Sequence, residues 1–201
     1  MRVSIPTIRF RITRAVRRLF RIDRERRWNA EYVAGDWSRL ARLDELAHHA
    51  VLAGYLRNLK PGGSVLDVGC GEGLLRTQLG DACGLYLGID FAEPIRLASA
   101  HATERTRFAI ADMHDFTTIE RFDAIIFDES LYYYKNQVAG LQRYTTMLAP
   151  QGVLLVSMHR TARTAVVWAQ IAEQFDSLDD VELTNRSGVA WTVKALIPRS
   201  V

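Results

Sequence analysis

The sequence predicts an α/β fold with a seven-stranded, mostly parallel sheet, helices on both faces and an antiparallel last strand. Three observations support this prediction. An apolar run at residues 65–68 leads into a glycine-rich turn, further apolar runs alternate with helical patterns, and two strand-like runs close the chain. With 201 residues, of which 48% are hydrophobic, the chain is long enough for one domain with one core.

The first part of the chain is strongly basic. Residues 1–27 carry a charge of +8, whereas the remainder carries −5. Apolar positions recur at helical spacing from Ile8 to Ile22 with arginines between them, which predicts a basic amphipathic helix over 8–24. This helix could dock on the body or a partner, or bind an anionic membrane surface. Nucleic acid is disfavoured because the acidic remainder would repel a phosphate backbone.

An aromatic cluster precedes a long helical pattern. Trp28, Tyr32 and Trp37 surround a break at Gly35, and a helix is predicted over about 38–58. The cluster is interpreted either as a lid over a binding site or as packing between this helix and the body. The chain is therefore divided into a basic helix within 1–27 and a domain over 28–201, in which 28–58 form a helical lid.

The first strand runs into a turn built for close approach of a ligand. Residues 65–68 have the apolar character of a strand that is buried on both faces. Gly69, Gly71 and Gly73 follow at a spacing of two, with the small Cys70 between them. Glycine lets the backbone pass near a ligand, whose polar groups can face the amides at the start of the next helix.

After this turn, helical and strand patterns alternate, which demands a parallel sheet covered on both faces. The predicted helices are 74–80, 94–102, 137–148 and 162–175, and the predicted strands are 85–89, 106–110, 123–127 and 152–158. Two last runs, 181–184 and 189–197, are separated by a turn over 185–188 and predict a hairpin.

Two acids indicate which ligand the glycine turn binds. Asp67 lies two residues before the first glycine, where an acid suits a cationic ammonium better than a pyrophosphate and so disfavours NAD. Asp90 ends the second strand and is well placed to accept hydrogen bonds from two ribose hydroxyls. With the glycines, these acids resemble motif I and the ribose-binding acid of class I S-adenosylmethionine (SAM) methyltransferases, over about residues 28–198.

The resemblance implies a Rossmann-like fold, SAM as cofactor and a set of cofactor-binding residues. Phe91 would cover the adenine with its ring. Asp112 would accept a hydrogen bond from the adenine amino group, and the amide of Met113 would meet the ring. Asp112 could instead cap the short helix that follows. The cofactor-binding residues implied are Asp67, Gly69, Cys70, Gly71, Gly73, Asp90, Phe91, Asp112 and Met113.

The segment after the fourth strand is the most individual part of the chain. Glu129, Leu131, Tyr132 and Tyr133 resemble the Glu-x-Leu-Tyr-Tyr segment of small-molecule methyltransferases, including the nodulation N-methyltransferase group that acts on an amino sugar. Glu129 is interpreted as a catalytic base or a rim residue, with capping of the next helix as the alternative. Tyr132 and Tyr133 are assigned to the site ahead of Tyr134, because two of three consecutive tyrosines at most can face one pocket.

Other polar residues follow the strand ends. Asp128 could accept a proton, anchor a substrate amine or be a solvated loop acid. His159 follows the fifth strand and is interpreted as a base or substrate contact, or as a loop histidine with a structural role. His114 is expected to face solvent.

No metal site is predicted. His48 and His49 are neighbours on the predicted helix, so their side chains are expected to diverge and to be unable to bind one ion. Cys70 and Cys83 lack partners at metal-ligand spacing and form no disulfide framework, which favours a reduced, cytoplasmic protein. No apolar run is long enough to cross a bilayer, so membrane contact is expected to be peripheral, at the inner face, through residues 8–24.

The predicted activity is transfer of a methyl group from SAM to oxygen or nitrogen of a small polar acceptor, with sugars and amino sugars as candidates. One alternative is an RNA or protein methyltransferase that docks through the basic arm. Another is a SAM-binding partner subunit without turnover. The oligomeric state is left open.

Overall fold

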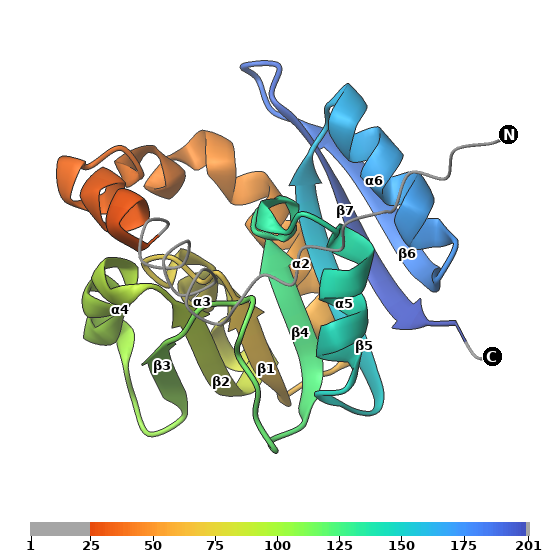
Figure 1. The fold of residues 1–201 in the computed structure, drawn as a ribbon, viewed down its shortest axis with the longest axis horizontal. Helices are drawn as coiled ribbons and strands as arrows, with labels where there is room; N and C mark the ends of the chain where they lie inside the picture. Colours follow the sequence, from red (N-terminus) through yellow and green to blue (C-terminus); the bar gives the residue numbers. More distant parts are fainter. Residues whose placement is uncertain (1–24, 200–201) are drawn as a thin grey trace, which may run out of the picture.

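A seven-stranded sheet forms the centre of the computed structural model, which describes residues 25–199. Its strands are β1 (Gly63–Val68), β2 (Cys83–Asp90), β3 (Thr106–Ile110), β4 (Phe122–Asp128), β5 (Leu148–His159), β6 (Phe175–Thr184) and β7 (Ala190–Pro198). They lie in the order β3-β2-β1-β4-β5-β7-β6 (Figure 1). β7 is antiparallel to β5 and β6, and the other neighbouring strands are parallel. The predicted fold class is therefore confirmed.

Helices cover both faces of the sheet. The α-helices are α2 (Leu46–Leu59), α3 (Leu74–Leu79), α4 (Ala92–Ala98), α5 (Gln137–Thr145) and α6 (Ala162–Ala172). The 3-10 helices are η1 (Ser38–Ala41), η2 (Leu43–Glu45), η3 (Gly80–Ala82), η4 (Ser99–His101) and η5 (Leu131–Tyr133). Residues 25–34 form a further helix, and the basic helix predicted over 8–24 lies outside the described residues.

Alternation along the strands divides the core into two layers. In β4, Ile125 and Phe127 belong to the core beneath α5 and α6, whereas Ala124 and Ile126 belong to the core beneath α2 and α3. Successive strand residues point to opposite faces, so an apolar run buries both of them. Because both faces of the sheet are covered by apolar side chains, polar side chains that contact a ligand are expected at the ends of the strands.

The helix predicted over 38–58 is shorter than expected. Residues 38–45 form η1 and η2, separated by Arg42 in an extended conformation (φ −78°, ψ 157°), before α2 begins. This interruption accompanies the packing of Trp37 against Trp28, whose ring centroids are 4.9 Å apart. Tertiary packing of this kind overrides the weak helical preference of a short segment.

The closing hairpin is longer than predicted. β6 begins at Phe175 and pairs with β7 as far as Pro198, so the helix predicted to reach residue 175 ends at Ala172. β6 is one of the two edge strands of the sheet, and its acids Asp176, Asp179 and Asp180 are exposed. Charged side chains on an edge strand oppose pairing with another chain.

The N-terminal helix at residues 25–34 and the two 3-10 turns lie over the edge of the sheet where the parallel strands end (Figure 1, red to orange). Trp28, Tyr32 and Trp37 from this segment contribute to the cavity described below. No helix within residues 25–199 has the length and apolar character needed to span a membrane.

Candidate active site

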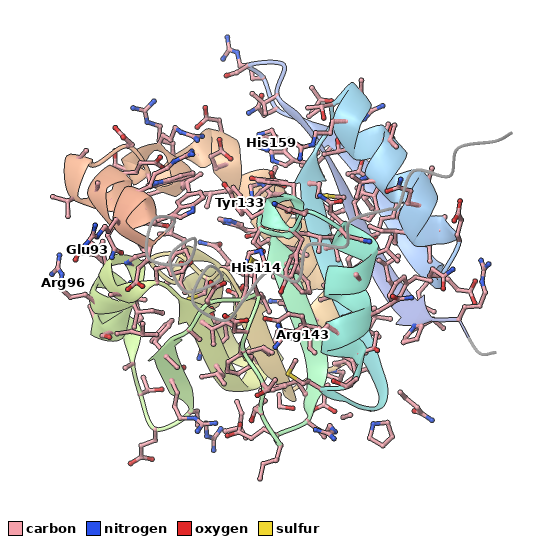
Figure 2. The ribbon with its side chains drawn as sticks, in the orientation of Figure 1. Glu93, Arg96, His114, Tyr133, Arg143 and His159 are labelled. Atoms are coloured by element: carbon pink, nitrogen blue, oxygen red, sulfur yellow. The ribbon has the colours of Figure 1, made fainter. Side chains whose placement is uncertain are left out.

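A cavity of about 310 Å³ is lined by residues at the carboxyl ends of β1, β2, β4 and β5. β1 lies between β2 and β4, so the connections that leave β1 and β4 diverge at this point. Open parallel sheets bind their ligands where such connections diverge. The N-terminal segment covers the same opening, and Figure 2 shows Tyr133, His114 and His159 around this upper edge of the sheet.

The glycine turn has a backbone that other residues rarely adopt. Gly69, Gly71 and Gly73 have φ values of +78°, +55° and +78°. A Cβ atom on Gly69 would lie 2.7 Å from the Cβ of Ser130, and one on Gly71 would lie 2.8 Å from the hydroxyl of Tyr32. Gly69 and Gly71 line the cavity, whereas Gly73 packs under Phe108. Glycine is therefore required here both for its conformation and for space.

Asp90 is held at the rim of the turn. Its Oδ2 accepts a hydrogen bond from the amide of Gly71 at 2.8 Å, and its Oδ1 accepts one from Phe91 at 2.7 Å. Burial raises the pKa of Asp90 to about 6, although these two hydrogen bonds act against the shift. Each carboxylate oxygen has further lone pairs that can accept from a ligand. Phe91 lines the cavity beside it.

Asp67 lies deeper and has an unsatisfied oxygen. The hydroxyl of Tyr86 donates to Oδ2 at 2.6 Å, while the buried Oδ1 has no hydrogen-bond partner among the described residues. Burial raises the pKa of Asp67 to about 7, with the hydrogen bond from Tyr86 opposing the shift. A bound cation would restore the charged form of this carboxylate. Cys70, which is also buried, lines the same part of the cavity.

The third strand end delivers Met113 to the cavity and leaves Asp112 beneath it. The Oδ1 atom of Asp112 accepts from the backbone amide of His114 at 2.9 Å and lies 2.8 Å from the Nδ1 atom of the His114 ring. Asp112 is buried beneath this lining and caps a turn over residues 113–115, where the alternative had expected a short helix, while its contact with adenine stays a prediction. His114 lines the cavity and packs against Tyr134, so the expectation that it faces solvent is wrong.

The structure pairs Glu129 with His159 across two strand ends. Oε2 of Glu129 accepts from the backbone amide of His159 at 3.1 Å and also contacts the ring Nδ1. Oε1 accepts from the hydroxyl of the buried Ser157 at 2.9 Å. The hydrogen bond that the His159 ring donates to Glu129 raises the pKa of His159 above its usual value, and burial opposes this shift. Both side chains line the cavity.

Two of the three consecutive tyrosines line the cavity. The rings of Tyr132 and Tyr133 meet edge to face, with centroids 4.7 Å apart. Tyr134 instead donates to the backbone carbonyl of Met113, and its ring packs over Gly140. The close contact at Gly140 leaves the Tyr134 ring in the core and fixes which tyrosines face the ligand space.

The aromatic cluster reaches across the cavity. The rings of Trp28 and Tyr133 meet edge to face with centroids 4.7 Å apart, and Tyr32 and Trp37 stack at 5.8 Å. The Tyr32 hydroxyl lies against Gly71 on the opposite side. The N-terminal segment therefore contacts both the glycine turn and the loop after β4.

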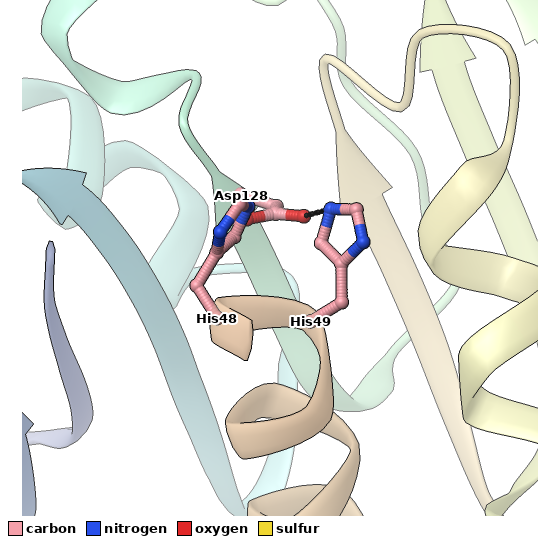
Figure 3. A group of neighbouring side chains, drawn as sticks. All are labelled: His48, His49 and Asp128. Atoms are coloured by element: carbon pink, nitrogen blue, oxygen red, sulfur yellow. Dashed lines mark ion pairs between the residues drawn. The ribbon is translucent and has the colours of Figure 1, made fainter. Parts of the chain in front are cut away.

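His48 and His49 converge on Asp128, contrary to the expectation that they diverge. Nε2 of His48 lies 3.3 Å from Oδ1 of Asp128, and Nε2 of His49 lies 2.9 Å from Oδ2 (Figure 3). Both rings reach the carboxylate from the first turn of α2. Consecutive helical residues differ by about 100° in direction around the helix axis, and the two side chains are long enough to span this difference. Burial lowers the pKa of His48. For His49 the nearby carboxylate outweighs burial and raises the pKa.

Asp128 carries a stable negative charge in this environment. Burial by itself would raise its pKa, but His49 and His48 outweigh burial and lower the pKa to about 2. The hydroxyl of Ser157 also lies 2.8 Å from Oδ1, so its single proton can be donated either to Asp128 or to Glu129. Ser157 thus lies between the carboxylates of Asp128 and Glu129, and it was absent from the predicted site because a serine within an apolar strand gives no signal in the sequence.

Comparisons with known proteins agree with this geometry. The family model of the methyltransferase domain matches residues 59–193. The ubiquinone biosynthesis O-methyltransferase of Haemophilus ducreyi is 32% identical over 113 residues, which cover 51% of this chain and 48% of the relative. The chain thus spans about half the length of the curated relatives that it matches.

Solved structures share the fold at low sequence identity. The N-methyltransferase NodS from Bradyrhizobium japonicum, in complex with S-adenosyl-L-homocysteine (SAH), has a TM-score of 0.69 at 21% identity, covering 82% of this chain and 92% of NodS. The 1,6-didemethyltoxoflavin-N1-methyltransferase of Burkholderia thailandensis has a TM-score of 0.74 at 16% identity, covering 98% and 94%. The family match, the strand order and the cavity beside the glycine turn agree, and the chain belongs to the methyltransferase domain family as a class I, SAM-dependent member.

Proposed function

We propose that the protein transfers a methyl group from SAM to an oxygen or nitrogen atom of a small polar acceptor. The pairing of Glu129 with His159 in the same cavity as the glycine turn carries this proposal. It supplies a proton acceptor beside the predicted cofactor site. Sugars and amino sugars are the acceptor classes we favour, because carboxylates and aromatic rings line the cavity together.

The residues around the glycine turn fit a SAM molecule. The buried Oδ1 of Asp67 has no partner among the described residues and suits the ammonium group, while Asp90 at the rim suits the ribose hydroxyls. The glycines leave space that a side chain would fill. Bound SAM would supply an activated methyl group on a sulfonium. Phe91 and Met113 would contact the adenine, and Asp112 would accept a hydrogen bond from its amino group.

The Glu129–His159 pair is suited to removing a proton from the acceptor. Because Glu129 engages Nδ1, a neutral His159 carries its proton there, which leaves the lone pair of Nε2 as the acceptor. Glu129 then stabilises the imidazolium that forms. An alcohol requires this proton transfer during the reaction, whereas a neutral amine requires only positioning and later loss of a proton.

Aromatic side chains complete the acceptor side of the cavity. Tyr132, Tyr133 and Trp28 face the space between the glycine turn and His159. Aromatic faces pack well against the apolar faces of sugars and stabilise cationic groups. Their closure over the cavity would exclude water and align the acceptor with the methyl group. We therefore retain the lid interpretation of residues 28–58 as part of the proposal.

Transfer of a labelled methyl group provides the test. The full-length chain is incubated with methyl-labelled SAM and a metabolite extract, and products are separated by size and identified by mass spectrometry. Label in a small molecule supports the proposal. Label in RNA or protein would favour a macromolecular substrate, and SAH binding without transfer to any fraction would favour a partner subunit without turnover. A matched reaction with His159→Asn identifies label that depends on this site.

A further inference from the structure

Three potential metal ligands meet at the floor of the cavity. The ligand atoms of His48, His49 and Asp128 all lie within 4.8 Å of one another. The side chains of these residues are 2%, 8% and 9% exposed, yet all three line the cavity. They are thus buried from bulk solvent but accessible from the ligand space. Figure 3 shows the carboxylate between the two imidazole rings.

Packing holds these side chains in place. The ring of His48 stacks on the buried Trp191 with centroids 5.0 Å apart, and the ring of His49 meets that of His48 edge to face at 4.4 Å. The hydroxyl of Ser157, on the neighbouring strand, lies 2.8 Å from Oδ1 of Asp128. In both histidines Nδ1 has no hydrogen-bond partner among the described residues, so each ring acts through Nε2. Two nitrogens and a carboxylate oxygen are therefore oriented before any ligand binds.

The separations of these atoms are close to those in a metal site. A tetrahedral ion with bonds of about 2.1 Å separates its ligand atoms by about 3.4 Å. The distances from Nε2 to the nearest carboxylate oxygen are 3.3 Å for His48 and 2.9 Å for His49. Small side-chain shifts would accommodate an ion. Two imidazoles and one carboxylate suit borderline divalent ions such as Zn²⁺, Co²⁺ or Fe²⁺ better than Mg²⁺ or Ca²⁺, which prefer oxygen ligands.

The surrounding charges also favour a cation. Buried carboxylate oxygens without a hydrogen-bond partner occur nearby, at Oδ1 of Asp67 and Oε2 of Glu45. Both carboxylates interact electrostatically with His49. Glu129 lines the same cavity one residue after Asp128. A divalent ion would favour the charged forms of these carboxylates, which burial disfavours.

We propose that Nε2 of His48, Nε2 of His49 and one carboxylate oxygen of Asp128 bind a divalent transition-metal ion, with its remaining coordination positions open to the cavity. Three protein ligands with an open position are typical of catalytic metal sites. If the proposed methyl transfer holds, an acceptor hydroxyl bound at that open position would lose its proton more readily. This second step rests on the proposed function, whereas binding of the ion does not.

Titration of the chain with Co²⁺ tests the site. The full-length protein, without a histidine tag, is stripped with a chelator and titrated with Co²⁺ while calorimetry and the visible absorption of the ion are recorded. We expect one equivalent to bind to the wild type and to His101→Gln, a control in the exposed η4. In His49→Gln and Asp128→Asn the affinity should fall at least about 100-fold. Absence of saturable binding, or equal affinity in these variants, would overturn the site.

Three further measurements separate misfolding and loss of function from loss of the metal. Binding of SAH by each variant reports whether it is folded. If a variant fails to bind SAH, X-ray absorption of the wild-type Co²⁺ complex decides the outcome: two imidazole ligands support the site, and none or one overturns it. Methyl transfer by the chelator-treated wild type, measured with and without Co²⁺, tests the activity separately from the binding of the ion.

Discussion

Glu129 positions the imidazole of His159 through two contacts with a single carboxylate oxygen. Oε2 accepts from the backbone amide of His159 at 3.1 Å and pairs with Nδ1 of its ring. Glu129 does so from a left-handed backbone conformation with φ +51°, which is rare for a residue other than glycine. Such conformations cost about 1–3 kcal/mol and persist where surrounding contacts determine them. Here those contacts come from Ser157 and His159 at the end of β5.

The first prediction concerns the pH dependence of turnover. His159 must be neutral to accept a proton, and Glu129 raises its pKa, so kcat/KM of the wild type should rise with pH around a midpoint above about 6.5. In Glu129→Gln that midpoint should move down, while kcat falls by about 10²-fold. Glu173→Gln, an exposed change at the C-terminal end of α6, should leave both unchanged. A midpoint that stays in place would show that Glu129 does not tune the base.

The same pair should make stability depend on pH in a defined direction. Because the folded pKa of His159 lies above its unfolded value, the protonated form favours the folded state at low pH. This contribution is fully present below about 6.5 and disappears as pH rises through the folded pKa. Denaturant unfolding of wild type and His159→Asn at several pH values should therefore give a difference that shrinks with increasing pH. A difference that grew with pH would contradict the assignment.

The carboxylate of Asp90 should control the affinity of the protein for its cofactor. Asp90→Ala removes the acceptor for the amide of Gly71 and for the proposed ribose hydroxyls. Hydrogen bonds to charged groups contribute about 1.5–3 kcal/mol, so the affinity for SAH should fall at least about tenfold. Calorimetry measures this change, with the exposed Asp81→Ala as the matched control. Equal affinities in both variants would remove Asp90 from the cofactor site.

Two glycines at positive φ allow the effect of backbone strain to be distinguished from the effect of a steric contact in the cavity. Gly71→Ala and Gly188→Ala both place a side chain at positive φ, +55° and +83°, but only at Gly71 does the new Cβ approach another group, the hydroxyl of Tyr32 at 2.8 Å. Each should lower the melting temperature, since alanine at positive φ costs about 1–2 kcal/mol. Gly71→Ala alone should weaken SAH binding. If Gly188→Ala weakens it equally, the effect is one of global stability.

The lid interpretation leads to a kinetic prediction. Trp28 contacts Tyr133 across the cavity, so Trp28→Ala should open the acceptor side and raise KM for the acceptor several-fold. Trp168→Ala is the matched control, because Trp168 lies on α6 and lines a separate cleft near Lys194. Steady-state kinetics with saturating SAM give KM for the acceptor in each variant. A rise in KM for both variants, or for neither, would favour the simple packing alternative for residues 28–37.

The basic leader gives a prediction from sequence charge alone. Residues 1–27 carry +8, so the full chain should float with anionic vesicles and less with neutral ones, and deletion of 1–27 should abolish the difference. Added salt should weaken the binding, because the attraction is electrostatic. Equal recovery with both kinds of vesicle would favour docking on the body or a partner. The folded state of the deletion variant is checked by its SAH affinity.

The order of elements and the cofactor turn could be read from the sequence because each depends on local patterns. Apolar runs buried on two faces, the glycine spacing of Gly69, Gly71 and Gly73, and the acid at Asp90 are visible within a few residues of one another. Strand ends of a parallel sheet meet at one edge, so Glu129 and His159 could also be assigned to the same opening before their contact was known.

Relations between distant residues required the tertiary structure. The convergence of His48, His49 and Asp128 depends on where α2 begins relative to the end of β4, and α2 begins only after the two 3-10 turns at residues 38–45. Side-chain direction on a helix follows from the neighbours that pack against it, so adjacent positions can serve one site. The chain by itself therefore determined the class of fold and the edge of the sheet at which the cavity lies. Packing decided which side chains meet there, because burial and contact are properties of the assembled layers and not of any one segment.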